Sequence, residues 1–393
     1  MTQSSIDSKS SANPPEAVKP AFPFLDLKAQ FASIREEVME AVSRVLESRQ
    51  FILGPEVQQF EEEIATKLGA RYAIGCASGT DALILALMAA GIGPGDEVIT
   101  TPFSFVATAG SIAQVGAKPV FVDIEPASFN IDPQKLEAAI TSKTRAIMPV
   151  HLFGLPADLD PILAVAISKK LFVIEDAAQA IGSRYNGRFI GTIGDFGCFS
   201  FFPSKNLGAA GDGGLITTND ATMAERLRMI RVHGSKRKYF HDIHGINSRL
   251  DALQAAILRV KLRHLDSWTA GRVNRAQRYR HLFDEKGLTR FVRYPAIPPE
   301  PFLHVYNQFT IRAQHRDELK ESLSKAGIPT EIYYPLCLHL QRAFSALGYQ
   351  PGQMPIAQKV SQEALSLPVF PELTDAQQDS VVHAIAGFYL SQK

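Results

Sequence analysis

The chain has 393 residues, of which 46% are hydrophobic and 21% are charged, and its formal net charge is +1. This length predicts two or three domains whose cores need no disulfides, and the nearly balanced charge gives no sign of a nucleic-acid surface. The longest apolar stretches have about half the length of a bilayer span, so no membrane attachment is expected.

The three cysteines lie far apart in the sequence. Cys76, Cys198 and Cys337 form no CxxC pattern, which argues against a zinc ribbon and favours a reduced, cytoplasmic protein. His241 and His244 are close together in HDIH, but no third ligand accompanies them, so no metal site is predicted.

The first predicted elements are helices. Residues 1–21 are polar, contain Ser and Pro and lack an apolar h-region, so we expect a flexible tail rather than a signal peptide. From Phe24 to about Leu68, apolar residues recur at helical spacing in two stretches separated by FILGPEV.

Short apolar runs alternate with helical stretches between Tyr72 and Thr218. The predicted strands cover residues 97–101, 118–124, 145–153, 171–177, 198–202 and 214–218. Such alternation is typical of βαβ units. We therefore expect an α/β fold, a three-layer sandwich in which helices cover both faces of a mainly parallel central sheet.

A long amphipathic helix is predicted to begin in residues 251–268, and the pattern changes after Pro295. An extended segment, VYNQFTIRA, precedes a second helical stretch, RDELKESLSKAG. These elements indicate a smaller C-terminal α/β domain. We expect residues 22–262 to form the large domain and residues 263–393 the small one.

Residues that follow the strands are the candidates for a binding site, because open α/β sheets bind ligands at the carboxyl ends of their strands. Ser78, Gly79 and Thr80 precede the helical stretch DALILALMAAG. Hydroxyls and free N–H groups at a helix start favour an anion such as phosphate, although an ordinary helix cap has the same sequence. The segment matches neither the P-loop nor the dinucleotide fingerprint.

Three further candidates follow predicted strands. Asp176 ends the apolar run LFVIE, where a carboxylate needs a cationic partner, which could equally be a salt-bridged Arg or Lys. Lys205 follows CFSFF and precedes a glycine-rich loop, where its amine is either reactive or extended to solvent. Phe105, after EVITT, is either a ligand platform or part of the core.

Together these groups match the requirements of pyridoxal 5'-phosphate (PLP). A lysine forms a Schiff base with this cofactor, an acid keeps its pyridine nitrogen protonated, an aromatic ring stacks on it and a helix start binds its phosphate. The sequence therefore predicts a PLP site.

Four segments in one order, SGTDAL, EDAAQA, SFFPSKNLG and GINSRLDALQAAIL, make the chain resemble the PLP-dependent nucleotide-sugar aminotransferases of the DegT/StrS family. The similarity extends from FLDL at Phe24 to LPVFPEL at Leu367, nearly the whole chain. The resemblance implies a fold-type I enzyme and a homodimer whose active sites are shared across the interface.

The resemblance also assigns roles to the candidates. Lys205 matches the lysine of the internal aldimine, Asp176 the partner of the pyridine nitrogen, and Gln179 the residue near the phenolic oxygen. Phe105 fits the stacking aromatic better than Phe103. The phosphate contacts implied are Ser78, Gly79, Thr80 and Ser200, with Asn247 reaching the cofactor of the neighbouring subunit.

Substrate contacts are expected in three places. Lys238 and His241, in KRKYFHDIHG, are expected at the diphosphate across the dimer, or else form a solvated loop. Arg249 is expected at the donor's carboxylate, or else braces its loop. Tyr333, Tyr334 and His339, in YYPLCLHLQ, are expected on the sugar side, or else pack one domain on the other.

The activity implied is amino transfer from L-glutamate to a nucleotide-linked keto-sugar, at carbon 3 rather than carbon 4. A related branch of sugar dehydratases has histidine where this chain has Lys205, so a dehydratase-like reaction is the alternative within enzymes. A regulator that holds PLP without turnover is the alternative outside them.

Overall fold

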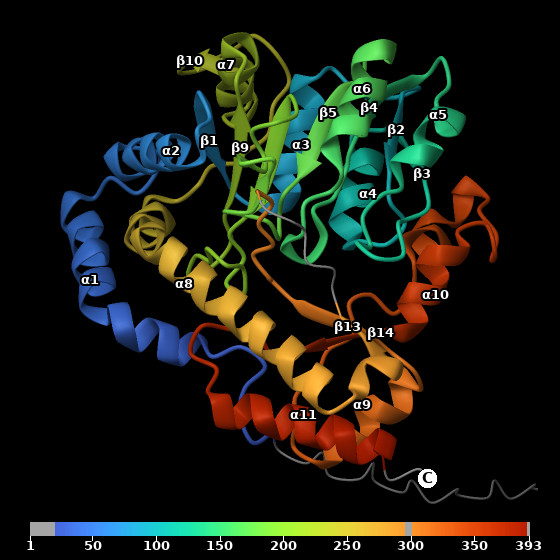
Figure 1. Cartoon of the computed structure of the whole chain (residues 1–393). Helices are drawn as coiled ribbons and strands as arrows, with labels where there is room; N and C mark the ends of the chain where they lie inside the picture. Colours follow the sequence, from blue (N-terminus) through green and yellow to red (C-terminus); the bar gives the residue numbers. More distant parts are fainter. Residues whose placement is uncertain (1–19, 295–300, 391–393) are drawn as a thin grey trace, which may run out of the picture.

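The computed structural model describes residues 20–294 and 301–390. Most of the predicted N-terminal tail, residues 1–19, therefore lies outside the described part of the chain. Figure 1 shows the two parts of the molecule, a sheet enclosed by helices and a smaller unit below it, joined by the long helix α8.

A seven-stranded sheet forms the centre of the large part, in the order β1-β9-β8-β5-β4-β2-β3. Its strands are β1 (Tyr72–Cys76), β2 (Glu97–Thr100), β3 (Lys118–Phe121), β4 (Thr144–Ile147), β5 (Phe172–Asp176), β8 (Phe196–Ser200) and β9 (Gly214–Thr218). Only β9 runs against its neighbours, and β5 is paired in parallel with both β4 and β8. The expected mainly parallel sheet is confirmed, and β1 is a strand that the sequence analysis did not predict.

Helices cover both faces of this sheet, as the alternation of buried side chains requires. Val173 and Leu215 face a core that includes α2 and α6, whereas the next residues, Ile174 and Ile216, face a core that includes α3 and α7. The helices are α1 (Leu27–Ser48), α2 (Pro55–Leu68), α3 (Gly79–Ala89), α4 (Val106–Gln114), α5 (Leu136–Ala139), α6 (Leu159–Lys169) and α7 (Ala221–Ile230). The three-layer sandwich is therefore the observed architecture.

The smaller part has a three-stranded antiparallel sheet of β12 (Val292–Arg293), β13 (Phe309–Ala313) and β14 (Ala364–Leu367). Its helices are α9 (Arg316–Lys325), α10 (Pro355–Glu363) and α11 (Asp375–Leu390). Two short antiparallel ribbons complete the strands of the described residues: β6 (Arg184–Tyr185) with β7 (Arg188–Phe189), and β10 (Ser235–Arg237) with β11 (Phe240–His241).

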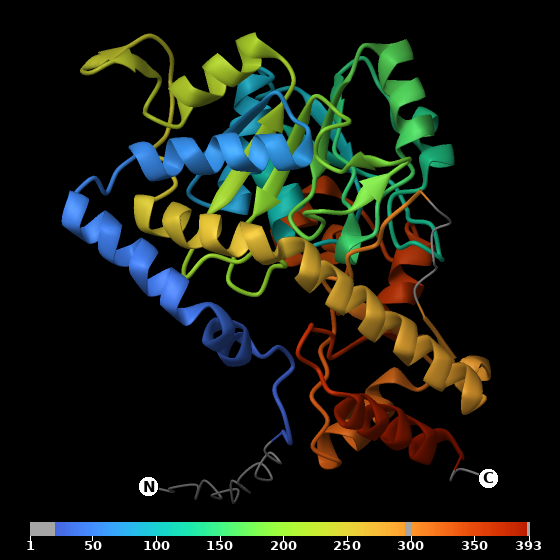
Figure 2. The ribbon, with the colours of Figure 1, turned by 60° about the vertical axis from the view of Figure 1, so that its left-hand side comes forward.

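Helix α8 (Ala252–Glu285) runs without interruption through the expected domain boundary at residues 262–263. Figure 2 shows it extending from beneath the sheet to the smaller part. Its buried residues up to Trp268 belong to the core beside the sheet, and those from Ala276 onward to the core of the smaller part. Phe22 also packs in that second core, so the chain enters the fold through the smaller part. The division at residue 262 stays a prediction.

Several predicted strands are longer than the observed ones. The stretch 145–153 forms a strand only to Ile147, and then turns through Phe153, whose φ is 59°. The extended segment 305–313 becomes strand β13 only at Phe309, because Tyr306 also has a positive φ of 44°. Within the described residues, no helix is long and apolar enough to cross a bilayer.

Candidate active site

Lys205 lies in a tight turn that follows β8. Its N–H donates to the carbonyl oxygen of Phe202 at 2.9 Å. The turn closes so tightly that a Cβ on Gly208 would lie 2.3 Å from the carbonyl oxygen of Pro203, so only glycine fits there. The half-buried amine makes no hydrogen bond or ion pair with any residue in 20–294 or 301–390. Burial lowers the pKa of Lys205 to about 8, although the charge of Asp176 opposes this shift.

Asp176 ends β5, the parallel neighbour of β8. Its side chain accepts hydrogen bonds from Thr108 Oγ1 at 2.8 Å and from the N–H of Ala178 at 3.2 Å. Burial raises the pKa of this carboxyl, while the Thr108 hydroxyl and the Lys205 charge act in the opposite direction. The site therefore holds a desolvated acid whose charged form gains from a cation placed beside it.

Gln179 connects this site to two other segments. Its Oε1 accepts a hydrogen bond from the N–H of Phe153 at 2.7 Å, and its Nε2 donates to the hydroxyl of Tyr334 at 3.1 Å. Burial, as the largest effect, raises the pKa of Tyr334. The amide is thus held in one orientation by a main-chain donor and a phenolic acceptor.

The start of α3 forms a cradle against the end of β8. Ser78 caps the helix by accepting a hydrogen bond from the N–H of Asp81 at 3.1 Å. A Cβ on Gly79 would lie 2.6 Å from Cβ of Ser200, so glycine is required for this approach. Gly79 and Thr80 lead the helix, where N–H groups lack partners within the helix. The positive end of the helix and two hydroxyl residues therefore meet at one place.

The two candidate stacking residues, Phe105 and Phe103, differ in how far their rings are exposed. Phe105 is 56% exposed and lies just before α4, with its ring centroid 6.3 Å from that of Tyr334 and tilted by 40°. Phe103 is fully buried and meets Phe129 and Phe153 edge to face. Only Phe105 is available to stack on a ligand.

These residues fit PLP. An amine without a partner among the described residues, a buried acid, an anion cradle that a Cβ would fill and an exposed aromatic ring meet the separate needs of its aldehyde, pyridine nitrogen, phosphate and ring. The sheet explains the proximity, since β5 and β8 are adjacent and their carboxyl ends lie at one edge.

The loop that carries Asn247 runs beside the start of α3. Ser248 accepts a hydrogen bond from the N–H of Ala77 at 3.2 Å, whereas Asn247 itself is exposed and forms a bridge with Val232. Arg249 is half-buried, and its guanidinium makes no hydrogen bond or ion pair within the described ranges. Both side chains are therefore unengaged by their own described chain.

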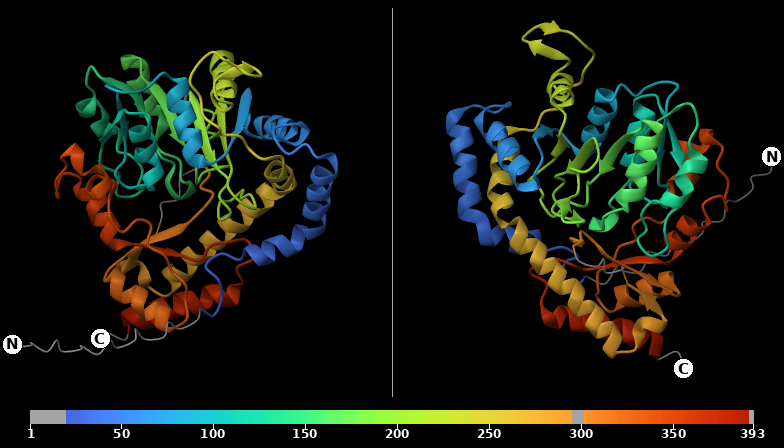
Figure 3. Two further views of the ribbon diagram at one scale, coloured as in Figure 1. Left: turned by 180° about the vertical axis from the view of Figure 1, so that it is seen from behind. Right: turned by 45° about the horizontal axis from the view of Figure 1, so that its top comes forward.

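Lys238 and His241 lie in the β10–β11 hairpin, which stands away from the body of the molecule in Figures 2 and 3. Tyr239, at its tip, is 81% exposed, and the Lys238 ammonium lies 5.0 Å from the centre of that ring. His241 Nδ1 lies 2.9 Å from the carbonyl oxygen of His233. The structure thus separates these two residues from Lys205 within one chain.

The three residues expected on the sugar side differ in their surroundings. Tyr334 contacts Gln179 and Phe105, and half-buried Tyr333 lies next to it. His339 is only 1% exposed and packs against Phe121 and Tyr349. The structure brings Tyr334 to the site and gives His339 the surroundings of a core residue.

A buried pair beneath the site was not predicted. Glu175 is fully buried, and its carboxylate accepts hydrogen bonds from His151 Nε2 at 3.0 Å and from three N–H groups, those of Gly191, Ile193 and Gly194. His151 Nδ1 accepts from the N–H of Ala157, so its Nε2 carries the proton. The only signal in the sequence was an acid beside Asp176, because the partners lie far from it along the chain.

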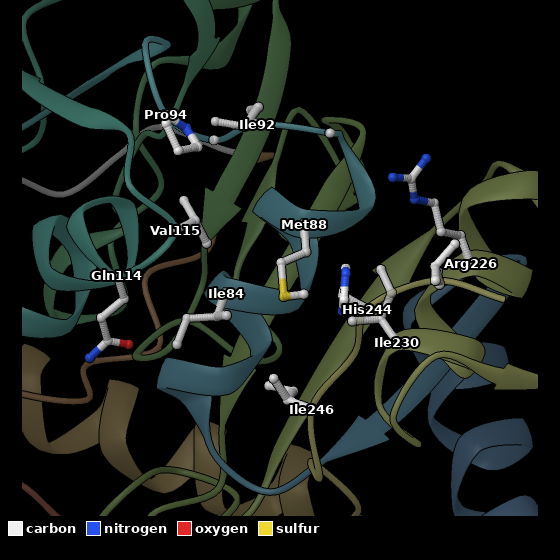
Figure 4. Close-up of a pocket in the computed structure, with 13 residues that line it drawn as sticks. Ile84, Met88, Ile92, Pro94, Gln114, Val115, Arg226, Ile230, His244 and Ile246 are labelled. Carbon is white, nitrogen blue, oxygen red and sulfur yellow. The ribbon is translucent and has the colours of Figure 1, made fainter. Parts of the chain in front are cut away.

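A hollow of about 640 Å³ lies elsewhere on the surface (Figure 4). It is lined mainly by apolar side chains of α3, α7 and the loops that follow these helices, among them Ile84, Met88, Ile230 and Ile246. None of its lining residues is a predicted site residue, so it is separate from the chemistry at Lys205.

Comparison with known proteins matches most of the chain to one family. The sequence profile described as the DegT/DnrJ/EryC1/StrS aminotransferase family matches residues 32–386. A protein of Geobacillus stearothermophilus named as a pleiotropic regulatory protein is 54% identical, over 93% of this chain and 98% of that protein. The UDP-N-acetyl-3-dehydro-alpha-D-glucosamine 3-aminotransferase of Acidithiobacillus ferrooxidans is 48% identical, over 91% of this chain and 95% of that protein.

A solved structure resembles the fold closely. The crystal structure of DesV from Streptomyces venezuelae, in complex with a ketimine intermediate, superimposes with a TM-score of 0.91 at 43% identity. The match covers 94% of this chain and 99% of that chain.

Proposed function

The chain belongs to the DegT/DnrJ/EryC1/StrS aminotransferase family, and on this premise we propose that it transfers the amino group of L-glutamate to a nucleotide-linked keto-sugar. PLP is the cofactor. In the balanced reaction the donor becomes 2-oxoglutarate, and the carbonyl group of the sugar becomes an amine. We further propose carbon 3 as the position aminated, because the Acidithiobacillus relative is named for that position.

One observation carries the proposal: a lysine amine that has no partner in the described part of the chain stands beside a buried acid. The pKa of Lys205 is lowered to about 8, first by burial, so about one tenth of the amine is neutral at pH 7 and available as a base, far more than for an ordinary lysine. Asp176 is a buried carboxyl whose pKa burial raises, so a cationic ring nitrogen beside it would favour its charged form.

The residues of the chain divide the work of the reaction. When bound, PLP supplies an electron sink that stabilises negative charge on the donor's α-carbon. Nζ of Lys205 would be the base that takes the proton from that α-carbon and delivers it to the cofactor as the amino group is transferred. Asp176 would hold the proton on the pyridine nitrogen. Gln179, whose amide is oriented by Phe153 and Tyr334, would contact the phenolic oxygen.

The cradle at the start of α3 would bind the phosphate. Ser78, Gly79, Thr80 and Ser200 present N–H groups and hydroxyls at the positive end of the helix. Phe105 would stack its exposed ring on the pyridine face. Tyr333 and Tyr334 would contact the sugar.

We propose a homodimer in which each site is completed by the partner. Asn247 would reach the partner's phosphate, Lys238 and His241 would meet the diphosphate there, and Arg249 would bind a carboxylate. The projecting hairpin and the Arg249 guanidinium, which makes no hydrogen bond or ion pair within the described ranges, support this arrangement. The buried free thiols of Cys76, Cys198 and Cys337 support a reducing, cytoplasmic location.

The regulator alternative is less well supported, although one relative is named as a regulatory protein. This chain brings Lys205, Asp176 and Gln179 to one site, and a protein that only holds PLP has no need of a base and a protonated ring nitrogen. The dehydratase alternative is not favoured, because Lys205 is present.

The proposal is tested with the purified chain, PLP, L-glutamate and a matched panel of UDP- and dTDP-linked 3-keto and 4-keto hexoses. Mass spectrometry should detect amino-sugar and 2-oxoglutarate in equal amounts with a 3-keto substrate. Product from only the 4-keto substrates would overturn the proposed position. Formation of neither product with any keto-sugar would overturn the proposed reaction.

A further inference from the structure

Lys205 is followed by an asparagine whose side chain reaches the C-terminal part of the chain. Asn206 is 4% exposed. Its Nδ2 donates to the carbonyl oxygen of Val305 at 3.0 Å, and its Oδ1 accepts from Nδ2 of Asn307 at 2.9 Å. Because only the amide nitrogen donates to the Val305 carbonyl, that bond fixes the orientation of the Asn206 amide. Asn307 must then supply the donor to Asn206 Oδ1.

Both main-chain polar groups of Asn307 make hydrogen bonds. Its N–H donates to the carbonyl oxygen of Phe153 at 2.9 Å, and its carbonyl accepts from Nη1 of buried Arg272 at 3.3 Å. Arg272 also donates to the carbonyls of Tyr306 and Val369. Tyr306 and Phe153 have φ values of 44° and 59°, a region that side chains with a Cβ rarely adopt. Such residues persist where their surroundings hold them.

The same short segment also contacts the turn that positions Gln179. The N–H of Val305 donates to the carbonyl oxygen of Gly154 at 3.1 Å. Phe153, which accepts from Asn307, in turn donates its own N–H to Oε1 of Gln179 at 2.7 Å. Residues 305–307 therefore join two turns that come from different strands of the large sheet.

The far side of the lysine turn is held separately. Nζ of Lys261, in α8, donates to the carbonyl oxygen of Gly208 at 2.7 Å, and the N–H of Ala209 donates to the carbonyl oxygen of Phe201 at 2.7 Å. These contacts fix the end of the turn behind Lys205. Among the described residues, the hydrogen bonds of the Asn206 side chain link residues 305–307 to the lysine turn.

We propose that Asn307 is a positioning residue for Lys205. Through Asn206, it holds the lysine turn in register with the turn of Gln179, so that the amine lies where the cofactor presents its carbonyl carbon. The inference rests on the proposed function. Its consequence is specific: loss of the Asn307 donor impairs the covalent bond to Lys205 and leaves the phosphate and pyridine contacts intact.

The test compares two ligands of the cofactor-free, full-length chain. PLP carries the aldehyde that reacts with a lysine, whereas pyridoxamine 5'-phosphate carries an amine there and binds through the other contacts alone. Asn307→Ala should weaken PLP binding by about five- to tenfold, the size expected for one buried hydrogen bond, and leave pyridoxamine phosphate binding within about twofold. Asn307→Asp, which keeps the volume and removes the donor, should behave in the same way.

The matched control is Thr310→Val. Thr310 and Ser366 are fully buried in the same part of the molecule and share a hydrogen bond of 2.7 Å that does not lead to Lys205. This variant should lose comparable thermal stability and bind both ligands as the wild type does. The proposal would be overturned if the Asn307 variants lost affinity for PLP and pyridoxamine phosphate equally, or lost affinity for neither. Failure of both variants to fold would also overturn it. Failure of the wild-type chain to bind PLP would instead overturn the proposed function.

Discussion

Two adjacent carboxylates at the end of β5 have opposite environments. Glu175 accepts hydrogen bonds from His151 and from three N–H groups; burial alone would raise its pKa, yet these donors hold the pKa below its usual range. Asp176 accepts from Thr108 and from the N–H of Ala178, and burial raises its pKa. Neighbouring residues of a strand point to opposite faces of the sheet. The Glu175 carboxylate therefore stabilises the fold through its hydrogen bonds, whereas the Asp176 carboxyl is able to bind a ligand.

Glu175→Ala should therefore destabilise the fold strongly. The substitution leaves His151 and the three N–H donors buried without their acceptor, and the free energy of unfolding should fall by about 3–5 kcal/mol. Urea denaturation followed by circular dichroism measures the change. Glu47→Ala, at an exposed position of α1, is the control and should stay within about 0.5 kcal/mol of the wild type. A similar small change for Glu175→Ala would contradict the structural role.

The amine of Lys205 should titrate well below an ordinary lysine. Only the neutral amine is nucleophilic, so the rate of its modification by trinitrobenzenesulfonate should rise with pH through a midpoint near its pKa of about 8. Peptide mass spectrometry of the cofactor-free chain follows this one lysine. Asp176→Asn should move the midpoint lower still, because the anion beside the amine raises its pKa. A midpoint near the ordinary value of about 10.4 would contradict the desolvated site.

Among the elements, the contact of α3 with β8 decides whether an anion can be held. Ser78 caps the helix, and Gly79 lets its first turn approach Ser200 more closely than any other residue would allow. The first turn of α3 can pack against the sheet at this position only because Gly79 has no Cβ.

Gly79→Ala should weaken PLP binding by more than about tenfold, because the new Cβ would lie 2.6 Å from Cβ of Ser200 and push the helix start away. Titration of PLP into the cofactor-free chain measures the affinity. Gly110→Ala is the matched control: a Cβ there meets nothing within 4 Å, and alanine favours helix α4, so binding should be unchanged and stability slightly higher. If Gly79→Ala binds PLP like the wild type, the cradle is placed wrongly.

The sequence predicts these elements unevenly, for physical reasons. The period of apolar residues reveals the strands around Asp176 and Lys205, since it records which side chains are buried. It does not reveal where residues 145–153 leave the sheet, because Phe153 and Tyr306 are held in left-handed conformations by contacts remote in sequence. The Glu175–His151 and Asn206–Asn307 pairs were missed for the same reason: neither partner changes the local pattern.

At the scale of the whole molecule, several residues proposed for the active site face outward in the described chain. The β10–β11 hairpin projects from the body, and Asn247 is exposed beside the start of α3. A symmetric dimer would give each of these residues a place in the partner's site. The single chain would then hold Lys205 and Asn247 in two different sites.

Mixing two inactive variants tests this arrangement. Lys205→Ala and Asn247→Ala should each have little activity as separate dimers. After unfolding and refolding as an equal mixture, half of the dimers should be hybrids with one intact site each, restoring about one quarter of the wild-type activity. Co-refolded Lys205→Ala and Asp176→Ala is the control, because both changes fall in the site of one chain if the fold is as described; a hybrid dimer then has no intact site. Equal recovery in both mixtures, or in neither, would contradict sites shared through Asn247.

The most direct test of the account is the absorption spectrum of the chain with PLP, before and after L-glutamate is added alone. The account predicts a band near the visible edge that requires Lys205 and moves to shorter wavelength with the donor. Lys205→Ala should lack that band before the donor is added, while still binding pyridoxamine phosphate. A band that forms equally in Lys205→Ala, or one that L-glutamate leaves unchanged, would contradict the transfer of an amino group at Lys205.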